Sequence, residues 1–221
     1  MIAYNYSKDP YDTDYPTGTS QDFSYHGAHP YMNLWEGNVG YMIAPDNTWG
    51  SSSHSTYFRN YINNTRTMST DWGEWAMDIE AQSRYHNFVG NVIGVPGMSG
   101  YTYETACSGC NASKVIWRWG CKDQGGATSG CSTDPRNTAI IHGNYDYVTK
   151  QVHWDSTISD HTIPNSYYLS SKPVFFGGIA WPIIGSDLNP LVADIPAKLK
   201  FEGKTIPGVT DIEPPKNLRI K

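Results

Sequence analysis

The stretch Tyr57-Phe58-Arg59-Asn60-Tyr61-Ile62 decides the fold, because its pattern recurs along the chain. In this pattern an apolar or aromatic residue stands shortly before an Asn, and another follows it. The further copies are Ala3-Tyr4-Asn5-Tyr6, Leu34-Trp35-Glu36-Gly37-Asn38-Val39, Phe88-Val89-Gly90-Asn91-Val92-Ile93 and Ile140-Ile141-His142-Gly143-Asn144-Tyr145. Successive Asn residues are 33, 22, 31 and 53 positions apart. The shortest spacing corresponds to one coil of a parallel β-solenoid, and the longer ones to coils with insertions.

Each copy is too short to bury an apolar face alone, so the copies must stack on one another. Stacking would align the five Asn residues into a ladder in which each side-chain amide bonds to the next. Asn also tolerates the left-handed backbone conformation that a sharp corner needs. We therefore expect an all-β chain folded as a right-handed parallel β-helix. A β-sandwich or jelly roll is the main alternative, because it also joins short strands by turns.

The composition fits strands and turns and excludes two classes of partner. The chain has 221 residues and a formal net charge of −5, with no Lys/Arg cluster, so nucleic acid is not an expected partner. A mean hydropathy of −0.52 without a long apolar run excludes a membrane span. The opening residues lack the regions of a signal peptide, so we expect the natural N-terminus to lie upstream. We expect a β-helix domain over 1–205, and a linker or the start of a further module over the proline-rich 206–221.

The four cysteines, Cys107, Cys110, Cys121 and Cys131, lie in a Gly- and Ser-rich loop insertion of about 94–136. Two disulfides would staple a loop that lacks its own core, which favours an exported protein. Four thiolates around a structural zinc ion are the alternative, starting from the Cys107–Cys110 knuckle. The second half of the insertion lacks a matching Cys-x-x-Cys, so we expect disulfides in a secreted protein.

Two segments resemble proteins of the pectin-lyase-like superfamily of right-handed parallel β-helices. They are Phe23-Ser-Tyr-His-Gly-Ala-His-Pro-Tyr-Met-Asn-Leu-Trp-Glu-Gly-Asn38 and Trp49-Gly-Ser-Ser-Ser-His-Ser-Thr-Tyr-Phe-Arg-Asn60. The runs Ile163–Gly177 and Trp181–Gly185 look like the tail that wraps the end of such helices. The resemblance covers roughly residues 1 to 200 and is to a poorly characterised branch. It implies the fold and an activity on polysaccharides, but the three-Asp site of polygalacturonases and the calcium site of pectate lyases have no counterpart here.

Ionisable groups concentrate between residues 22 and 59, at positions that stacked coils would place along one groove. The candidate catalytic residues are His26, His29, Glu36, Asp46, His54 and Arg59. For β-elimination a His would remove the proton next to a uronate carboxyl while Arg59 or Arg84 stabilises the charge. For hydrolysis two carboxylates would flank the scissile bond. These groups could equally only brace turns. We expect no resident cofactor, with calcium or structural zinc as alternatives.

Aromatic side chains are the candidate sugar contacts, because flat rings stack on sugar faces. They are Trp72, Trp75, Trp117 and Trp119, and Arg84 is a further candidate binding residue. Trp117 and Trp119 would lie on one side of a strand and Arg118 on the other. Burial in the core is the competing interpretation of every Trp. Residues His153, Asp155, Asp160 and His161 could line a groove, although a packed closing segment explains them more simply.

These patterns predict an extracellular polysaccharide lyase or glycoside hydrolase acting on a plant, algal or microbial polymer. A non-catalytic carbohydrate- or surface-binding module is the first alternative. A structural or assembly β-solenoid is the second, since an open first coil would expose strand edges to self-association. Further modules of a longer parent chain are the other expected partners.

Overall fold

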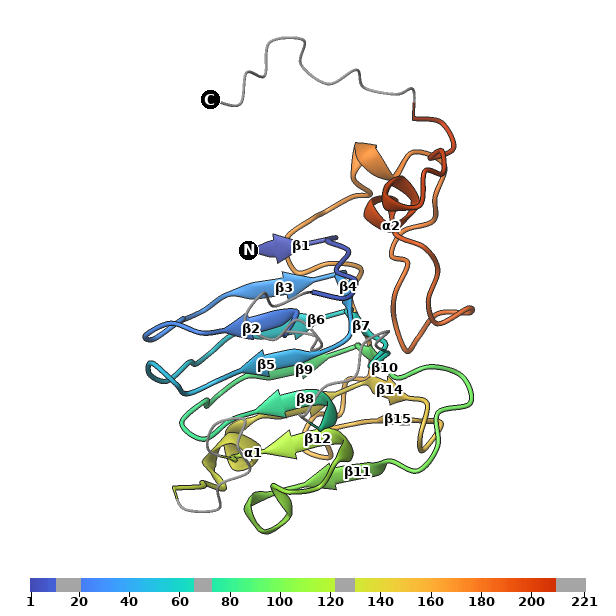
Figure 1. The fold of residues 1–221 in the computed structure, drawn as a ribbon. Helices are drawn as coiled ribbons and strands as arrows, with labels where there is room; N and C mark the ends of the chain where they lie inside the picture. The colour runs from blue at the N-terminus through green and yellow to red at the C-terminus, as the bar shows by residue number, and fades with distance from the viewer. Residues whose placement is uncertain (11–20, 66–72, 122–129, 210–221) are drawn as a thin grey trace.

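The computed structural model describes residues 1–10, 21–65, 73–121 and 130–209 and is built from short strands (Figure 1). The strands are β1 (Ile2–Ala3), β2 (Phe23–Tyr25), β3 (Leu34–Glu36), β4 (Val39–Gly40), β5 (Ile43–Pro45), β6 (Thr56–Phe58), β7 (Tyr61–Ile62), β8 (Glu74–Ile79), β9 (Asn87–Val89), β10 (Val92–Ile93), β11 (Thr102–Thr105), β12 (Lys114–Trp119), β13 (Ile140–His142), β14 (Asn144–Asp146) and β15 (Gln151–His153). The helices are short: η1 (Cys107–Gly109), α1 (Asp134–Thr138), η2 (Val174–Phe176) and α2 (Pro196–Phe201). The expectation of an all-β chain is confirmed.

Three five-stranded sheets carry the architecture. Sheet 1 has the order β1-β3-β6-β9-β13, sheet 2 the order β15-β14-β10-β7-β4, and sheet 3 the order β11-β12-β8-β5-β2. The named strands pair in parallel, except β14 with β15. From β2 to β10 the chain visits sheet 3, sheet 1 and sheet 2 in turn, three times over. In the last circuit two strands, β11 and β12, both join sheet 3 before β13 enters sheet 1 and β14 and β15 enter sheet 2. A β-sandwich, which needs antiparallel pairing within its sheets, does not match this order.

The core is filled by side chains that lie in register on successive strands of sheet 1. Trp35, Tyr57 and Phe88 are cross-strand partners. The Tyr57 and Phe88 rings stack with centroids 5.0 Å apart and an interplanar angle of 5°. From sheet 3, Trp117 and Trp119 enter the same core, stacked on each other at 5.2 Å. Alternation along each strand sends every second side chain inward, so the residues between them face outward.

The predicted asparagine ladder is present. The Nδ2 of each ladder Asn donates to the Oδ1 of the next, from Asn5 through Asn38, Asn60 and Asn91 to Asn144, over 2.8–3.0 Å. The backbone N–H of each Asn also donates to that same Oδ1. The ladder runs along the corner between sheet 1 and sheet 2, where it satisfies polar groups that a tight buried corner would otherwise leave without partners.

We expected the ladder Asn to form the bend at this corner, but the bend falls one residue earlier. The residues that precede the ladder Asn all have positive φ, between 50° and 68°: Tyr4, Gly37, Arg59, Gly90 and Gly143. Three of them are Gly, which adopts this conformation without steric cost. The ladder Asn therefore contributes its side-chain amide rather than its backbone tolerance.

The expected loop insertion is more ordered than predicted. Within 94–136 the chain forms β11 and β12, and β12 is the regular partner of β8 in sheet 3. The fully buried Arg118 lies on the outer side of β12, as predicted, and its Nη1 donates to both carboxylate oxygens of an equally buried Asp78 at 2.8 and 2.9 Å. The stretch around Cys110 covers this pair, and Arg118 Nε donates to the Cys110 carbonyl.

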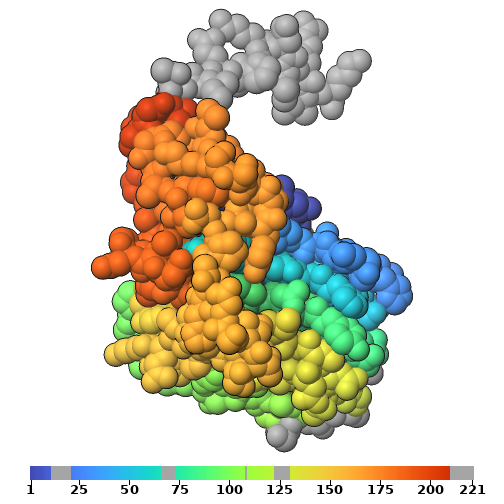
Figure 2. Space-filling model, turned by 180° about the vertical axis from the view of Figure 1, so that it is seen from behind, coloured from blue at the N-terminus to red at the C-terminus, as the bar shows by residue number. Residues whose placement is uncertain are grey.

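The C-terminal part of the chain runs back along the outside of the sheets (Figures 1 and 2). Phe176, Ile184 and Ile195 pack with Tyr4 and Val39 of the N-terminal end in one buried cluster. This packing continues past the predicted domain boundary at residue 205. Ile206 is buried, and the Pro207 carbonyl accepts a hydrogen bond from Gly178 N–H. The segment 210–221 of the predicted linker lies outside the described residues.

Candidate functional site

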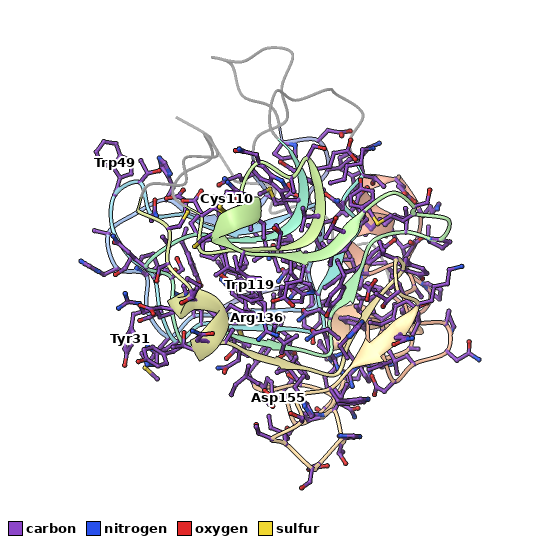
Figure 3. The ribbon with its side chains drawn as sticks, turned by 90° about the horizontal axis from the view of Figure 1, so that it is seen from below. Tyr31, Trp49, Cys110, Trp119, Arg136 and Asp155 are labelled. Carbon is purple, nitrogen blue, oxygen red and sulfur yellow. A yellow bond between two sulfur atoms is a disulfide. The ribbon has the colours of Figure 1, made fainter. Side chains whose placement is uncertain are left out.

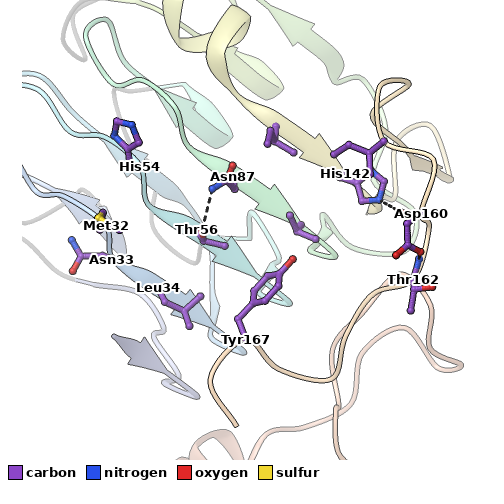
Figure 4. Close-up of a pocket in the computed structure, with 13 residues that line it drawn as sticks. Met32, Asn33, Leu34, His54, Thr56, Asn87, His142, Asp160, Thr162 and Tyr167 are labelled. Atoms are coloured by element: carbon purple, nitrogen blue, oxygen red, sulfur yellow. Dashed lines mark hydrogen bonds between the residues drawn. The ribbon is translucent and has the colours of Figure 1, made fainter. Parts of the chain in front are cut away.

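The outer face of sheet 1 holds a groove whose floor is one row of side chains (Figure 4). Leu34, Thr56, Asn87 and Ile140 are cross-strand partners on β3, β6, β9 and β13. Their neighbours along each strand fill the core, so these four side chains must face outward. Asn87 Nδ2 donates to Thr56 Oγ1 at 3.2 Å, which fixes the polar centre of the floor. Because strands lie about 4.8 Å apart, the lining repeats at that interval along the groove.

One wall is the corner between sheet 3 and sheet 1, and it carries exposed rings. Met32, His54 and Tyr85 follow the bridged residues Tyr31, Ser53 and Arg84, and all three have positive φ. Met32 and His54 line the groove, and Tyr85 occupies the next position in the same register, beside His54 and outside the lining itself. The His54 ring stacks on the Tyr85 ring at 4.9 Å, and the Tyr31 ring meets His54 edge-on at 5.3 Å.

The opposite wall is the chain segment 158–167, which crosses the outer side of the sheet. Ile158, Asp160, Thr162 and Tyr167 line the groove from this segment. Tyr167 lies over Phe58, with ring centroids 4.2 Å apart. The backbone N–H of Thr162 donates to Asp160 Oδ1 at 2.9 Å, and this bond, together with the Thr162 hydroxyl, lowers the pKa of the exposed Asp160 carboxyl.

His142 lines the groove next to Asp160, and one of its two ring nitrogens is buried without a hydrogen-bond partner. Its Nε2 donates to the Asp160 carbonyl at 2.9 Å, since a carbonyl can only accept. Its Nδ1 is buried and has no hydrogen-bond partner. The ring is 5% exposed and packs edge-on against Trp154. His142 is therefore fixed in orientation and offers one unused acceptor.

The groove has a volume of about 510 Å³ and combines apolar, amide and hydroxyl groups. That volume falls within the range of about 300–1,000 Å³ usual for small-molecule sites. Among the residues that line it, Asp160 is the one carboxylate, and none is Lys or Arg.

Two of the predicted catalytic residues, Glu36 and Arg59, serve as anchors for the C-terminal segment. Arg59 Nη1 and Nη2 donate to the two Asp187 carboxylate oxygens at 2.8 and 2.9 Å. Its other bonds go to the carbonyls of Ile163, Pro164 and Ile184. Glu36 is buried and accepts from the Tyr4 hydroxyl and the Tyr167 backbone N–H. These contacts occupy both groups.

His26 and Asp46, by contrast, form a direct pair at a separate place on the surface. His26 Nδ1 lies 2.6 Å from Asp46 Oδ2, and the Asp46 side chain is 2% exposed while that of His26 is 61% exposed. Asp46 Oδ1 accepts from Thr48 N–H. The exposed Trp49 donates its indole N–H to His26 Nε2 at 3.0 Å. A buried carboxylate thus orients an exposed imidazole whose second nitrogen accepts the Trp49 indole N–H.

The remaining predicted catalytic His residues lie apart from one another. His29 Nδ1 is 2.9 Å from Ser51 Oγ at the surface. His54 lies in the groove wall, and neither His26 nor His29 lines that groove. The six predicted catalytic residues therefore lie in four separate places rather than in one shared site.

The predicted sugar-stacking role is wrong for the described Trp residues, because their rings are buried. Trp75 is 5% exposed, Trp117 1% and Trp119 0%. Figure 3 shows Trp119 inside the molecule, whereas Trp49 and Tyr31 point outward at its edge. Trp72 lies outside the described residues. Arg84 is exposed and pairs with Asp134 at 2.8 Å.

Several residues around the groove were missed: Asn87, His142, Tyr85 and Tyr167. The first two stand in or next to copies of the Asn pattern, so aligning the copies would have placed them on the outer face. A further missed group is the buried His86 next to Tyr85. Its Nδ1 accepts from Ser55 N–H, and burial lowers its pKa to about 4.

One of the two expected disulfides is present, and the structure assigns its pairing, which the sequence left open, as Cys110 with Cys121. Cys107 and Cys131 are thiols, and Cys131 Sγ lies 3.6 Å from Cys110 Sγ. In the described part of the chain, no three side chains of His, Cys, Asp or Glu are grouped to hold a metal ion. None of the helices in that part has the length and apolar character needed to cross a bilayer.

Comparison of the chain with protein-family models, with curated proteins and with solved structures found no match. The resemblance to the pectin-lyase-like superfamily therefore remains an expectation from the residues quoted above.

Proposed function

We propose that this chain is an extracellular, right-handed parallel β-helix that binds a polysaccharide along the groove on sheet 1. The fold part of the proposal is supported by the cyclic order of the three sheets and by the asparagine ladder that joins successive circuits. The disulfide is compatible with an oxidising compartment.

The observation that carries the functional part is the groove lining. Its floor repeats from strand to strand, which suits a ligand that is itself a repeating chain. The rings of the wall offer flat apolar faces, and the amide and hydroxyl groups of Asn87 and Thr56 offer hydrogen bonds to sugar hydroxyls. A floor with apolar ends and a polar centre, beside stacked rings, suits the mixed polar and apolar surface of a sugar chain.

Binding is favoured over hydrolysis at this site because hydrolysis needs two carboxylates and the groove lining provides one. Asp160 is the one carboxylate among the lining residues. Glycoside hydrolysis needs two carboxyl groups about 5–9.5 Å apart across the scissile bond.

The test is affinity electrophoresis and calorimetry on a panel of soluble polysaccharides with wall variants. His54→Asn and Tyr85→Asn remove the rings while keeping a residue that accepts positive φ. Each ring contact contributes about 1 kcal/mol, so the double variant should bind at least tenfold more weakly. Phe201→Ala is the matched control, since it removes an exposed ring that belongs neither to the groove lining nor to the His26–Asp46 pair. Equal loss in the control, or no loss in the double variant, would refute the groove as the binding site.

A second candidate function, polysaccharide cleavage, is favoured by the His26–Asp46 pair. A buried carboxylate that holds Nδ1 leaves Nε2 as the basic nitrogen of His26, and it can act as a general base once the exposed Trp49 side chain that donates to it gives way to a ligand. Asp46→Asn keeps the shape of the pair but removes its charge. Cleavage should then fall by at least about a hundredfold, the usual contribution of a positioned base. Ultraviolet absorbance of unsaturated uronates reports elimination, and reducing ends without that absorbance report hydrolysis. Cleavage by Asp46→Asn at the wild-type rate, or no cleavage of any polymer, would dismiss this candidate.

A further inference from the structure

The charges around the groove restrict the chemical class of its ligand. The one formally charged residue in the lining is the Asp160 carboxylate. Thr162 donates to it through its backbone and its hydroxyl, which lowers its pKa and keeps it ionised near neutral pH. The groove therefore presents a negative charge to any ligand at that end.

Two Arg side chains near this region in the described part of the chain, Arg59 and Arg84, are already paired with carboxylates of the protein. Arg59 is bound to both oxygens of Asp187, and its side chain is 3% exposed. Arg84, which precedes Tyr85 in the wall, is paired with Asp134 at 2.8 Å. A groove that binds a polyanion needs cations that are free to pair with ligand carboxylates or sulfates. The formal net charge of −5 adds a repulsion at long range.

The uncharged groups of the groove fit uncharged sugar rings. Asn33, Thr56 and Asn87 supply amide and hydroxyl groups, and His54 supplies the face of a ring. Asp160 itself is a strong acceptor for sugar hydroxyl groups, which donate hydrogen bonds without carrying a charge.

Resting on the function proposed above, we propose that the groove takes a neutral polysaccharide, a polymer of hexose or pentose units without carboxylate or sulfate groups. This differs from the acidic substrate that the His and Arg residues of the sequence suggested. The physical reason is that Arg59 is bound to Asp187 and to carbonyls of the C-terminal segment, so it is not available to pair with an acidic ligand.

The test compares two polymers of one sugar backbone that differ in charge, through the ester methyl group that masks each carboxylate. Fully methyl-esterified homogalacturonan and its de-esterified form have one backbone, and only the second is a polyanion. Binding is measured by calorimetry at low ionic strength, where charge effects are largest. The neutral form should bind at least tenfold more tightly. The preference should shrink severalfold in Asp160→Asn, which removes the groove carboxylate and keeps its shape.

The outcomes separate this inference from the proposed function. Equal or tighter binding of the polyanion, weakened by the His54→Asn/Tyr85→Asn double variant, would overturn the neutral class and leave the groove as the binding site. Tighter binding of the polyanion that is not weakened in the double variant would overturn both the neutral class and the groove as the binding site. To cover neutral polymers of other backbones, hydroxyethylcellulose and carboxymethylcellulose form a second matched pair. Failure of all four polymers to bind would overturn the proposed function together with the inference.

Discussion

Replacing Asn60 by Ala tests the physical basis of the stacked strands. Asn60 is fully buried in the middle of the ladder. Its Oδ1 accepts from the backbone N–H and from Nδ2 of Asn38, at 3.0 and 2.9 Å. Its Nδ2 donates to Asn91 Oδ1 and to the Trp35 carbonyl, both at 3.0 Å. The substitution removes four hydrogen bonds and leaves the buried Asn38 N–H without its acceptor.

The size of the effect follows from these contacts. Each hydrogen bond contributes about 0.5–1.5 kcal/mol net, and a buried N–H without a partner costs about 1–3 kcal/mol. We expect Asn60→Ala to lower the free energy of unfolding by about 4 kcal/mol, a large fraction of the roughly 5–15 kcal/mol of a domain. Asn5→Ala is the matched control, because Asn5 ends the ladder and is exposed. Its loss should stay below about 1 kcal/mol.

Urea unfolding followed by Trp fluorescence measures both variants, and an unchanged dependence on urea shows that the unfolded states are comparable. The reasoning would be refuted if the two substitutions cost the same, or if Asn60→Ala cost less than about 1 kcal/mol. Either result would mean that apolar stacking alone sets the register and that the ladder is a consequence of it.

Three other substitutions test further parts of the structure. Arg59→Ala removes five hydrogen bonds to the C-terminal segment, so backbone amides after residue 155 should exchange their hydrogens at least tenfold faster while those of the sheets keep their protection; uniform acceleration would contradict a local anchor. Burial lowers the pKa of His86 from 6.5 to about 4, so below pH 6.5 the unfolded state takes up a proton that the folded state refuses. Stability should fall by on the order of 3 kcal/mol between pH 6.5 and 4, and His86→Gln should lack that part of the pH dependence; an unchanged pH profile would exclude His86 as its source. Cys121→Ser opens a disulfide with a sequence separation of 11, which should lower stability by about 3 kcal/mol under non-reducing conditions and not under reducing ones; a difference that persists after reduction would point to packing instead.

Much of the groove was beyond the reach of sequence reasoning, although the floor was within it. The copies of the Asn pattern, aligned on Asn60 and Asn91, place Thr56 and Asn87 in register, and alternation then turns both outward. The wall formed by residues 158–167 has no such signal, because its packing against sheet 1 is a contact between segments about 100 residues apart.

The short strands, the all-β character and the asparagine ladder could be predicted from the amino-acid sequence, because these follow from a local pattern repeated along the chain. The roles of Arg59 and of the Trp residues follow only from the packing of the folded chain. From the sequence, Trp117 could face either the core or a ligand, and Arg59 could bind a substrate. In the structure Trp117 is buried in the core and Arg59 is paired with Asp187. A side chain's role depends on which distant segment covers it, and that choice is made by the packing of the whole chain rather than by the neighbours in sequence.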